Sequence, residues 1–564
     1  MLYTFTHYAT LYELYVGLLR GLIAVAVCLS MLISVDRLYK VFVYMKIQMR
    51  TRLTGRKPEH EFSARPLPDP AAYSMVYPKV AVQLPMFNER AVCQAIIDSA
   101  CEMHWPSDRF CVQVLDDSTC KATRQLVDEK AAEWAERGVK CEVVRRTNRQ
   151  GYKAGALKDG LDLLGDYDYI AIFDADFKPE SDFLMQTVPY LIDNPEVGYV
   201  QARWVFANPD ESYLTKAQEI SLNFHCKCEQ FVHFASGSFF NFNGTAGVWR
   251  RKTIVTVGGW KSRTTVEDMD LSLRTYVNGW KAVYLSDTTC MNELPASFFA
   301  FRKQQHRWTC GPVQLWRRCS GDIWNSSLPL AAKLELLVLY FGIRKFATHW
   351  VSLGFFCTLV PLSVFTPEVN IPLWALVHLP VVVTITTAVF TPKGWLHCIL
   401  YVLFENAMGI VKLWAVIAGV LDLKQAQEWV VTTKLGSSDK RPGTGAGAPA
   451  PVLRFYASEM MMSTFVLTAA FYGIFSVNKW SFSIFLTLQG LVFFAFAFNM
   501  VDCGGILGGR LGNNVNMHAA SLKKAKAAAD SYKATGNKGC NMVSAARNLS
   551  VNGAALKPAY SSIL

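Results

Sequence analysis

The sequence of 564 residues lacks the spacings that mark several common kinds of site. Its 15 cysteines are scattered singly, and no Cys-x-x-Cys pair of the kind that binds zinc is present. A Walker phosphate loop is missing, and so is the interleaving of basic and aromatic residues that is typical of nucleic-acid binding. We therefore predict no disulfide framework, no structural zinc site and no nucleic-acid partner.

Two segments contain almost no acidic residues. Residues 37–57 include seven Lys or Arg and no acid, and residues 511–564 include seven against Asp530 alone. Basic residues that flank a membrane span tend to stay in the cytosol, so the first segment predicts a cytosolic central domain, unless it is a basic linker without topological meaning. The second predicts a solvated low-complexity tail, with contact to anionic lipid headgroups as the alternative.

Apolar residues make up 51% of the chain and are concentrated near the N-terminus and in the C-terminal half. This pattern predicts a membrane protein with a soluble middle. Two segments, 328–340 and 396–421, are interrupted by charged residues such as Lys412 and are expected at the membrane interface. Five further segments are long enough to cross a bilayer as helices and leave the N-terminus opposite the active site: 12–35, 342–365, 371–390, 460–477 and 482–500.

Between these apolar regions, short β-branched runs alternate with helical patterns. The helical patterns cover residues 90–101 and 121–137. Strand alternating with helix predicts an α/β domain whose mainly parallel sheet is covered by helices on both faces. Ligands of such sheets bind beyond the carboxyl ends of the strands. The expected strands are 80–84, 112–115, 142–144, 169–173 and 198–201.

Acidic residues stand where two of these strands end. Asp116 and Asp117 follow the second strand, and Asp174 and Asp176 follow the fourth. Crowded carboxylates repel each other unless a cation joins them, and Mg²⁺ and Mn²⁺ prefer oxygen ligands. We therefore predict that Asp174 and Asp176 hold a divalent cation, Mg²⁺ or Mn²⁺, together with the diphosphate of a nucleotide sugar. For any single Asp-x-Asp, a solvated turn is the structural alternative.

Three further positions complete the expected chemistry. Lys153, in a Gly-rich segment, is expected to act as a point charge on the diphosphate, with a solvated helix start as the alternative. A sugar hydroxyl needs a base to accept its proton, and we assign that base to Asp268, with Glu267 as its substitute. The competing explanation for this acidic pair is a favourable helix N-terminus.

The run Gln304-Gln305-His306-Arg307-Trp308 combines a cation for phosphate oxygens with a flat indole face on which a pyranose ring can stack. A belt of Trp and Arg at a membrane interface is the structural alternative, because an apolar region follows. The acidic clusters upstream favour the catalytic interpretation.

These motifs together resemble those of the processive family 2 glycosyltransferases, and within them the cellulose synthase-like A and C proteins of plants and green algae (glucomannan 4-β-mannosyltransferase-like). The resemblance extends from about residue 79 to residue 436. It is carried by Val-Leu-Asp-Asp-Ser-Thr at 114–119, Gly-Tyr-Lys-Ala-Gly-Ala-Leu-Lys at 151–158, Phe-Asp-Ala-Asp-Phe at 173–177, Phe-Asn-Gly-Thr-Ala-Gly-Val-Trp-Arg at 242–250, Thr-Val-Glu-Asp-Met-Asp-Leu at 265–271 and Gln-Gln-His-Arg-Trp-x-Cys-Gly-Pro at 304–312.

The resemblance implies a GT-A type nucleotide-sugar transferase domain inserted in an α-helical transmembrane bundle. It implies that Asp116 or Asp117 contacts the nucleoside, that Asp268 is the base, and that the acceptor end is lined by Gln304, Arg307 and Trp308. Residues 429–436, which include Thr432 and Lys434, look like the gating loop of bacterial cellulose synthases.

These assignments divide the chain into an anchor, a basic linker, the GT-A domain, interface helices with two spans, a gating-type loop with a flexible linker, two further spans and a basic tail. The corresponding residues are 1–36, 37–78, 79–320, 321–425, 426–455, 456–503 and 504–564.

The implied activity is metal-dependent, inverting β-1,4-transfer onto a growing polysaccharide at the bilayer, in the Golgi membrane. The favoured product is (gluco)mannan from GDP-mannose and GDP-glucose, because Lys-Ala-Gly-Ala-Leu at 153–157 looks A-type. Gln314-Leu315 looks C-type, so a β-1,4-glucan from UDP-glucose is the alternative. A non-processive transferase acting on a lipid carrier and a scaffold with a degenerate domain are the other readings. Homo-oligomers and accessory proteins stay open.

Overall fold

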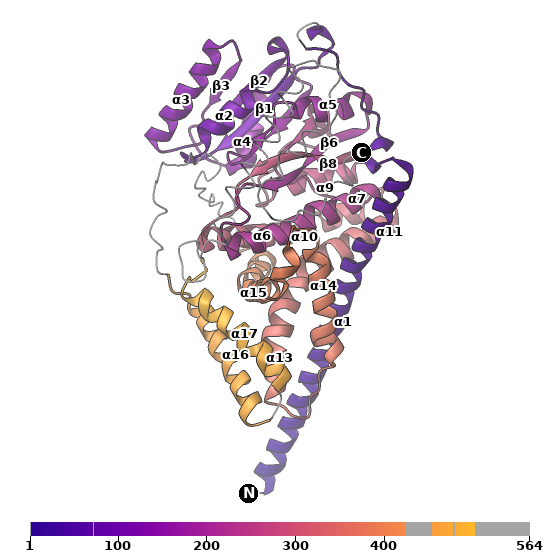
Figure 1. Cartoon of the computed structure of the whole chain (residues 1–564), viewed down its shortest axis with the longest axis vertical. Coiled ribbons are helices and arrows are strands. Elements are labelled where there is room, and N and C mark those ends of the chain that lie inside the picture. Colours follow the sequence, from indigo (N-terminus) through magenta and orange to yellow (C-terminus); the bar gives the residue numbers. More distant parts are fainter. Residues whose placement is uncertain (1, 71–72, 424–453, 478–479, 502–564) are drawn as a thin grey trace, which may run out of the picture. The chain divides into compact units, whose positions relative to one another are not determined.

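The computed structural model describes residues 2–70, 73–423, 454–477 and 480–501 (Figure 1). Thr432 and Lys434 of the expected gating-type loop lie outside the described residues, as does the basic tail from residue 504. What we predicted for these two segments therefore stays a prediction.

The central domain is built on one eight-stranded sheet with the order β3-β2-β1-β4-β7-β6-β8-β5. Four of its seven pairings are parallel and three are antiparallel. The expected strands are present, and the sheet is mixed but mostly parallel. The strands are β1 (Val80–Met86), β2 (Phe110–Asp116), β3 (Cys141–Val144), β4 (Tyr169–Ile172), β5 (Lys178–Pro179), β6 (Val197–Phe206), β7 (Gly247–Arg250) and β8 (Lys281–Asn292).

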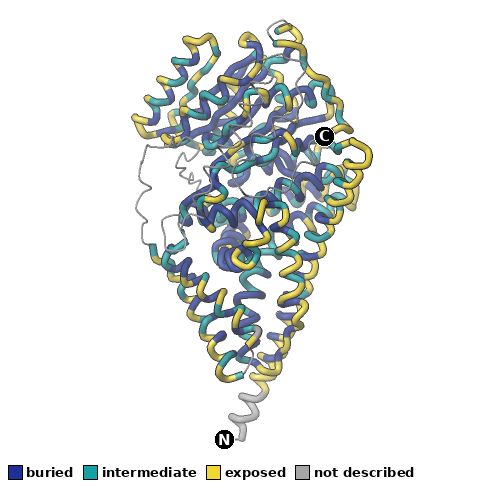
Figure 2. The backbone as a smooth tube through the Cα atoms, in the orientation of Figure 1, coloured by how far each residue is buried: buried dark blue, intermediate teal, exposed yellow. Residues whose placement is uncertain are grey.

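The register brings the carboxyl ends of the first strands together. Met86 of β1 pairs with Asp116 of β2, and Gln83 of β1 pairs with Ile172 of β4. Strands β1, β2 and β4 are fully buried, which explains their continuous apolar sequences (Figure 2). The sequence pattern did not reveal β5, β8 or β7, the last of which runs antiparallel between β4 and β6.

Helices pack on this sheet and on one another. The two predicted helices are α2 and α3, which contact each other, while α4 contacts β1 and β2. The helices of the domain are α2 (Cys93–Cys101), α3 (Lys121–Glu136), α4 (Tyr152–Leu163), α5 (Phe183–Asp193), α6 (Tyr213–Phe224), the π-helical η4 (His225–Gln230), α7 (Phe231–Ala235), α8 (Arg251–Thr256), α9 (Glu267–Val277) and α10 (Phe298–Trp324), with short 3₁₀ turns η1 (Pro58–Glu61), η2 (Ser74–Val76) and η3 (Ser107–Arg109).

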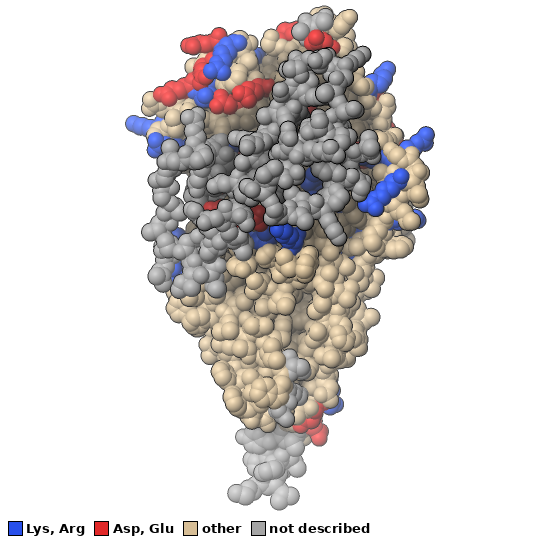
Figure 3. Space-filling model, viewed as in Figure 1, with Lys and Arg blue, Asp and Glu red and all other residues tan. Residues whose placement is uncertain are grey.

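The apolar segments form a second set of helices with its own hydrophobic core. On the face drawn in Figure 3, charged side chains gather over the central domain and are sparse over these helices. They are α1 (Leu2–Thr54), a continuous helix made of α11 (Leu330–Leu334), η5 (Glu335–Ala347), α12 (Thr348–Trp350), η6 (Val351–Leu359) and α13 (Val360–Val364), then η7 (Trp374–His378), α14 (Leu379–Ala388), η8 (Gly394–His397), α15 (Cys398–Leu421), α16 (Ala457–Phe475) and α17 (Trp480–Ala497).

The helix boundaries differ from expectation at the N-terminus. We expected the anchor to give way to a linker at residue 37, but α1 continues to Thr54. The physical reason is that no glycine or proline interrupts residues 37–54, and the first such residue is Gly55, whose φ is +67°.

Four helices of the described residues are long and apolar enough to cross a membrane: Thr10–Thr54, Leu330–Val364, Gly394–Leu421 and Ala457–Phe475. Trp374–Ala388 and Phe482–Ala497 are shorter. By length and composition, Gly394–Leu421, which we expected at the membrane interface, could also cross a membrane. In Figure 1 the view runs nearly along α15, whereas α1, α14, α16 and α17 lie across it, so α15 does not run alongside them. The interfacial position of this helix stays a prediction.

Candidate active site

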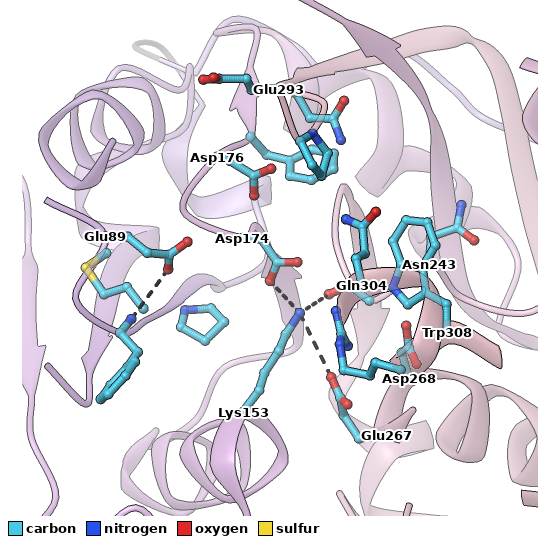
Figure 4. A pocket seen from close by; sticks show the side chains of 18 of the residues that line it. Glu89, Lys153, Asp174, Asp176, Asn243, Glu267, Asp268, Glu293, Gln304 and Trp308 are labelled. Atoms are coloured by element: carbon cyan, nitrogen blue, oxygen red, sulfur yellow. Dashed lines mark hydrogen bonds and ion pairs between the residues drawn. The ribbon is translucent and has the colours of Figure 1, made fainter. Parts of the chain in front are cut away.

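A pocket opens beyond the carboxyl ends of β1, β2 and β4 (Figure 4). Most of the predicted site residues meet here although they are far apart in the sequence. The lining side chains include Asp117, Lys153, Asp174, Asp176, Glu267, Asp268, Gln304, Arg307 and Trp308. Asp116 does not line this pocket.

The two neighbouring aspartates after β2 differ in role. Asp116 is buried, accepts the backbone N–H of Ser118 at 3.0 Å and accepts Nε of Arg145 at 2.9 Å. Asp117 reaches the pocket and is held by Nε of Arg146 at 2.9 Å and by a second bond to the same guanidinium. The geometry therefore gives Asp116 a structural position and leaves Asp117 as the one facing a ligand.

The loops after β1 and β2 are fastened together by Asn88. Its side-chain oxygen accepts hydrogen bonds from the backbone N–H groups of Thr119 and Cys120 at 2.9 and 3.0 Å, and its backbone N–H donates to the hydroxyl of Ser118 at 2.8 Å. The φ of Asn88 is +54°, a left-handed conformation that asparagine tolerates better than most residues. These hydrogen bonds hold the two loops together on the side of the pocket where Asp117 lies.

Lys153 lies at the centre of the pocket (Figure 4). Its ammonium group donates to Asp174 and to the carbonyl of Gly244 at 2.9 Å, and it lies 3.9 Å from Glu267. Burial by itself would lower the pKa of Lys153, but the carboxylates of Asp174 and Glu267 outweigh burial and raise it. The lysine therefore stays charged, and its position differs from the solvated helix start that we considered.

Glu267 and Asp268 begin α9 and point into the same pocket. Burial, followed by the neighbouring charge of Asp268, raises the pKa of Glu267 to about 8. Burial also raises the pKa of Asp268, while Lys153 and the backbone N–H of Met269 oppose that rise. The pair can thus share one negative charge at neutral pH, and Asp268 is the carboxylate with the better support for it.

Gly244 allows these groups to approach each other. Its φ is +82°, and a Cβ built there would lie 2.7 Å from Oδ2 of Asp268 and 3.5 Å from Nζ of Lys153. The adjacent Thr245 hydroxyl accepts the backbone N–H of Asp174 at 2.9 Å. The loop before β7 therefore lies in contact with both the end of β4 and the start of α9.

Helix α10 closes the opposite side of the pocket with Gln304, Arg307 and Trp308. The ring of Trp308 lies 6.5 Å from that of Trp204, centroid to centroid. Two indoles at this spacing form an apolar wall suited to a pyranose face. His306 does not line the pocket.

Sequence reasoning missed several lining residues, among them Trp204, Asn243 and Arg149. Arg149 stacks on Phe87, with 3.4 Å from its guanidinium carbon to the ring centroid. Asn243 exchanges two hydrogen bonds with Gln230. The motif around residue 243 was recognised, but nothing in its spacing indicated which of its side chains faces a ligand.

A second cavity, of about 280 Å³, continues from the first and shares Asp268, Gln304 and Trp308 with it. Its other walls come largely from the apolar set of helices and from α6. Apolar residues such as Phe224 and Phe301 line it together with many polar side chains: Arg37, Gln218, Ser221, Arg344, Lys345, Thr348, His349, Ser352, Thr387, Tyr401, Glu405 and Lys412. Polar side chains in helices of this kind are costly unless they pair or line a path.

The residues present fit a divalent cation only if a ligand supplies part of the coordination. Asp174 and Asp176 both reach the pocket from one short loop after β4. In the part of the chain that the structure describes, no three His, Cys, Asp or Glu side chains are grouped closely enough to hold a metal alone. Two carboxylates with diphosphate oxygens and water would suit Mg²⁺ or Mn²⁺.

Comparison with known proteins places this site in a family. The family model described as Glycosyl transferase family 2 matches residues 81–253, and Glycosyl transferase family group 2 matches residues 169–390. Glucomannan 4-beta-mannosyltransferase 1 of Oryza sativa subsp. japonica is 41% identical over 489 residues, which cover 85% of this chain and 93% of the relative. The chain belongs to the family 2 glycosyltransferases.

A second sequence relative is similar to the chain to the same degree. Glucomannan 4-beta-mannosyltransferase 9 of Arabidopsis thaliana is 41% identical over 85% of this chain and 91% of its own length. A solved mannosyltransferase from Pyrobaculum calidifontis, in complex with GDP-Man and Mn²⁺, is 18% identical, with a TM-score of 0.46 over 71% of this chain and 100% of its own. The sequence relatives confirm the family resemblance.

Proposed function

We propose that this chain is a membrane-embedded processive β-1,4-glycosyltransferase that makes a hemicellulose backbone, (gluco)mannan from GDP-mannose and GDP-glucose. The observation that carries the proposal is the position of Asp268, whose carboxylate borders both the Asp174–Asp176 pocket and the polar cavity behind it. A donor in one and an acceptor in the other would meet at this base.

On the donor side, the chain's own residues bind and orient. Asp117 faces the nucleoside end, while Lys153 contacts the diphosphate. A divalent cation bound at Asp174 and Asp176 would neutralise charge that develops on the leaving nucleoside diphosphate.

On the acceptor side, Trp308 and Trp204 support the terminal sugar ring, and Asp268 accepts the proton of the attacking hydroxyl. Attack from the face opposite the leaving group inverts the configuration at the anomeric carbon, which gives a β-linkage from an α-linked donor. The lengthened chain then retreats into the second cavity, where hydroxyl-binding side chains such as Lys345 and Ser352 line its path.

The sugar assignment follows the relatives, whose names state a 4-β-mannosyl transfer. We place the protein in the Golgi membrane with a cytosolic active site, on the basic segment after the first span and on the family resemblance. Thr432 and Lys434 are proposed to close over the donor.

The test is incorporation of radiolabel into polymer by membranes that carry this chain, given GDP-mannose, GDP-glucose or UDP-glucose with Mg²⁺ or Mn²⁺. Product from GDP-mannose that endo-mannanase digests supports the proposal. Endo-glucanase-sensitive product from UDP-glucose would move the chain to glucan synthesis. Label that appears only in the lipid extract would favour a lipid-carrier transferase instead.

A further inference from the structure

We propose that Lys153 is a built-in counter-ion of the metal site, which makes binding of the divalent cation depend on the nucleotide. Its ammonium group pairs with Asp174 until a diphosphate draws it away, so that the cation and the diphosphate enter together. The inference rests on the proposed metal-dependent transfer and adds an order of binding to it.

The contacts of Lys153 place it in competition with a metal. Its Nζ donates a hydrogen bond to the carboxylate of Asp174, one of the two proposed metal ligands. It donates a second hydrogen bond to the carbonyl of Gly244 at 2.9 Å. Its side chain is 10% exposed. A positive charge held this closely to Asp174 repels a second cation and occupies an oxygen that the cation needs.

The remaining ligands are too few to overcome that competition. Asp176 is the other carboxylate of the pair, and no cluster of three metal-binding side chains exists among the described residues. Glu267, 3.9 Å from Nζ, adds a third acceptor that keeps the ammonium group in place. The protein alone therefore offers a divalent cation a weak site.

A nucleoside diphosphate reverses this balance. It brings negative oxygens for both the metal and the lysine, and a lysine can follow them because its ammonium group is a point charge on a flexible four-carbon stem. Lys153 then moves from Asp174 to the phosphates, and the freed carboxylate coordinates the cation. Donor binding and metal binding become mutually dependent, as linkage requires.

The experiment measures binding of Mn²⁺ to the purified full chain in detergent by electron paramagnetic resonance, with and without GDP. We expect the wild-type protein to bind Mn²⁺ weakly alone and at least about tenfold more tightly with GDP. Lys153→Met should bind Mn²⁺ alone at least about tenfold more tightly than wild type, and GDP should add much less. A gain of affinity cannot come from misfolding.

Two variants sharpen the result. Lys153→Arg keeps the charge, so its Mn²⁺ binding should still depend on GDP. Lys158→Met removes an exposed lysine from the same helix and should behave as wild type. Equal Mn²⁺ affinity of wild type with and without GDP, or no gain in Lys153→Met, would overturn the inference and leave the proposed function intact. No Mn²⁺ binding by any form even with GDP would instead count against metal-dependent transfer.

Discussion

At the scale of single residues, the site depends on carboxylates that burial keeps from ionising together. Glu267 and Asp268 are neighbours at the start of α9, and both have raised pKa values because they are buried. One charge is useful to a base that accepts a proton, whereas two would repel each other. The roles of the pair therefore follow from their environment, not from their chemical identity.

Replacing the base tests this assignment directly. Asp268→Asn should reduce polymer synthesis by about 10²- to 10⁴-fold, the usual contribution of a general base. Binding of GDP should persist, because the diphosphate contacts lie at Asp174, Asp176 and Lys153. Isothermal titration and label incorporation measure the two effects. Asp162→Asn, at an exposed position of α4, is the control, and near-normal synthesis by the Asp268 variant would refute the role.

Glu267 gives a prediction about stability and pH in the metal-free protein. Its folded pKa of about 8 lies above its ordinary value of 4.5, so the folded state keeps a proton that the unfolded chain releases. This contribution to stability is fully present below pH 4.5 and is lost as pH rises through about 8. Glu267→Gln lacks that loss, so its melting temperature should gain on the wild type between about pH 5 and 8. If the melting temperatures of the two proteins change in parallel with pH across this range, the pKa of Glu267 is not raised in the folded state.

At the scale of elements, the site requires α10 to lie very close to the start of α9. Gly311 provides this approach, because a Cβ there would lie 2.4 Å from Val266, directly before Glu267. Trp308 is one turn earlier on the same helix. The distance between the aromatic wall and the base is thus set by a residue without a side chain.

Gly311→Ala should push α10 away from α9. We expect a destabilisation of about 1–3 kcal/mol, typical of overpacking, together with a loss of transfer activity. Gly321→Ala is the matched control on the same helix, since no atom lies within 4 Å of its added Cβ; it should be neutral or stabilising by up to about 1 kcal/mol. Thermal unfolding and label incorporation distinguish the two. Equal behaviour of both variants would contradict the packing argument.

At the scale of the whole described chain, two hydrophobic cores meet at a polar cavity. One core surrounds the sheet and the other joins the apolar helices. Lys40 of α1 pairs with Glu229 of η4 at 3.1 Å and so joins the two sets of helices, while Arg344 of η5 pairs with Asp36 of α1 at 2.9 Å beside it. If a polysaccharide passes through this junction, residues such as Trp308 line both the site of transfer and the path of the product.

Narrowing that passage should separate the two activities. Ser352 lines the second cavity, and Ser352→Phe should shorten the product while release of GDP from the donor continues. Val338→Phe, at a 49% exposed position of the same continuous helix, should leave product length unchanged. Gel filtration of labelled product and a GDP-release assay provide the readouts. Full-length product from Ser352→Phe would rule out this cavity as the path.

The α/β core, the family and the charged residues of the site motifs could be predicted from the residues alone, whereas lining residues such as Trp204, Asn243 and Arg149 could not. Continuous apolar strands identify a buried sheet, and Asp174, Asp176 and Asp268 stand in motifs whose order is specific. Burial periodicity is a local property, so it can be read from neighbouring residues. The same local reasoning explains why the short antiparallel β7 was not found.

Which side chains meet in the pocket follows from the three-dimensional fold. Asp116 and Asp117 are chemically identical neighbours in the sequence. Asp116 pairs with Arg145 in the interior, whereas Asp117 pairs with Arg146 and lines the pocket. Lys153 meets Asp174, Gly244 and Glu267 because the sheet order places β4 beside β7 and because α9 starts next to the loop before β7. Such contacts depend on chain crossings and on the close approach of elements distant in sequence, which no local pattern encodes.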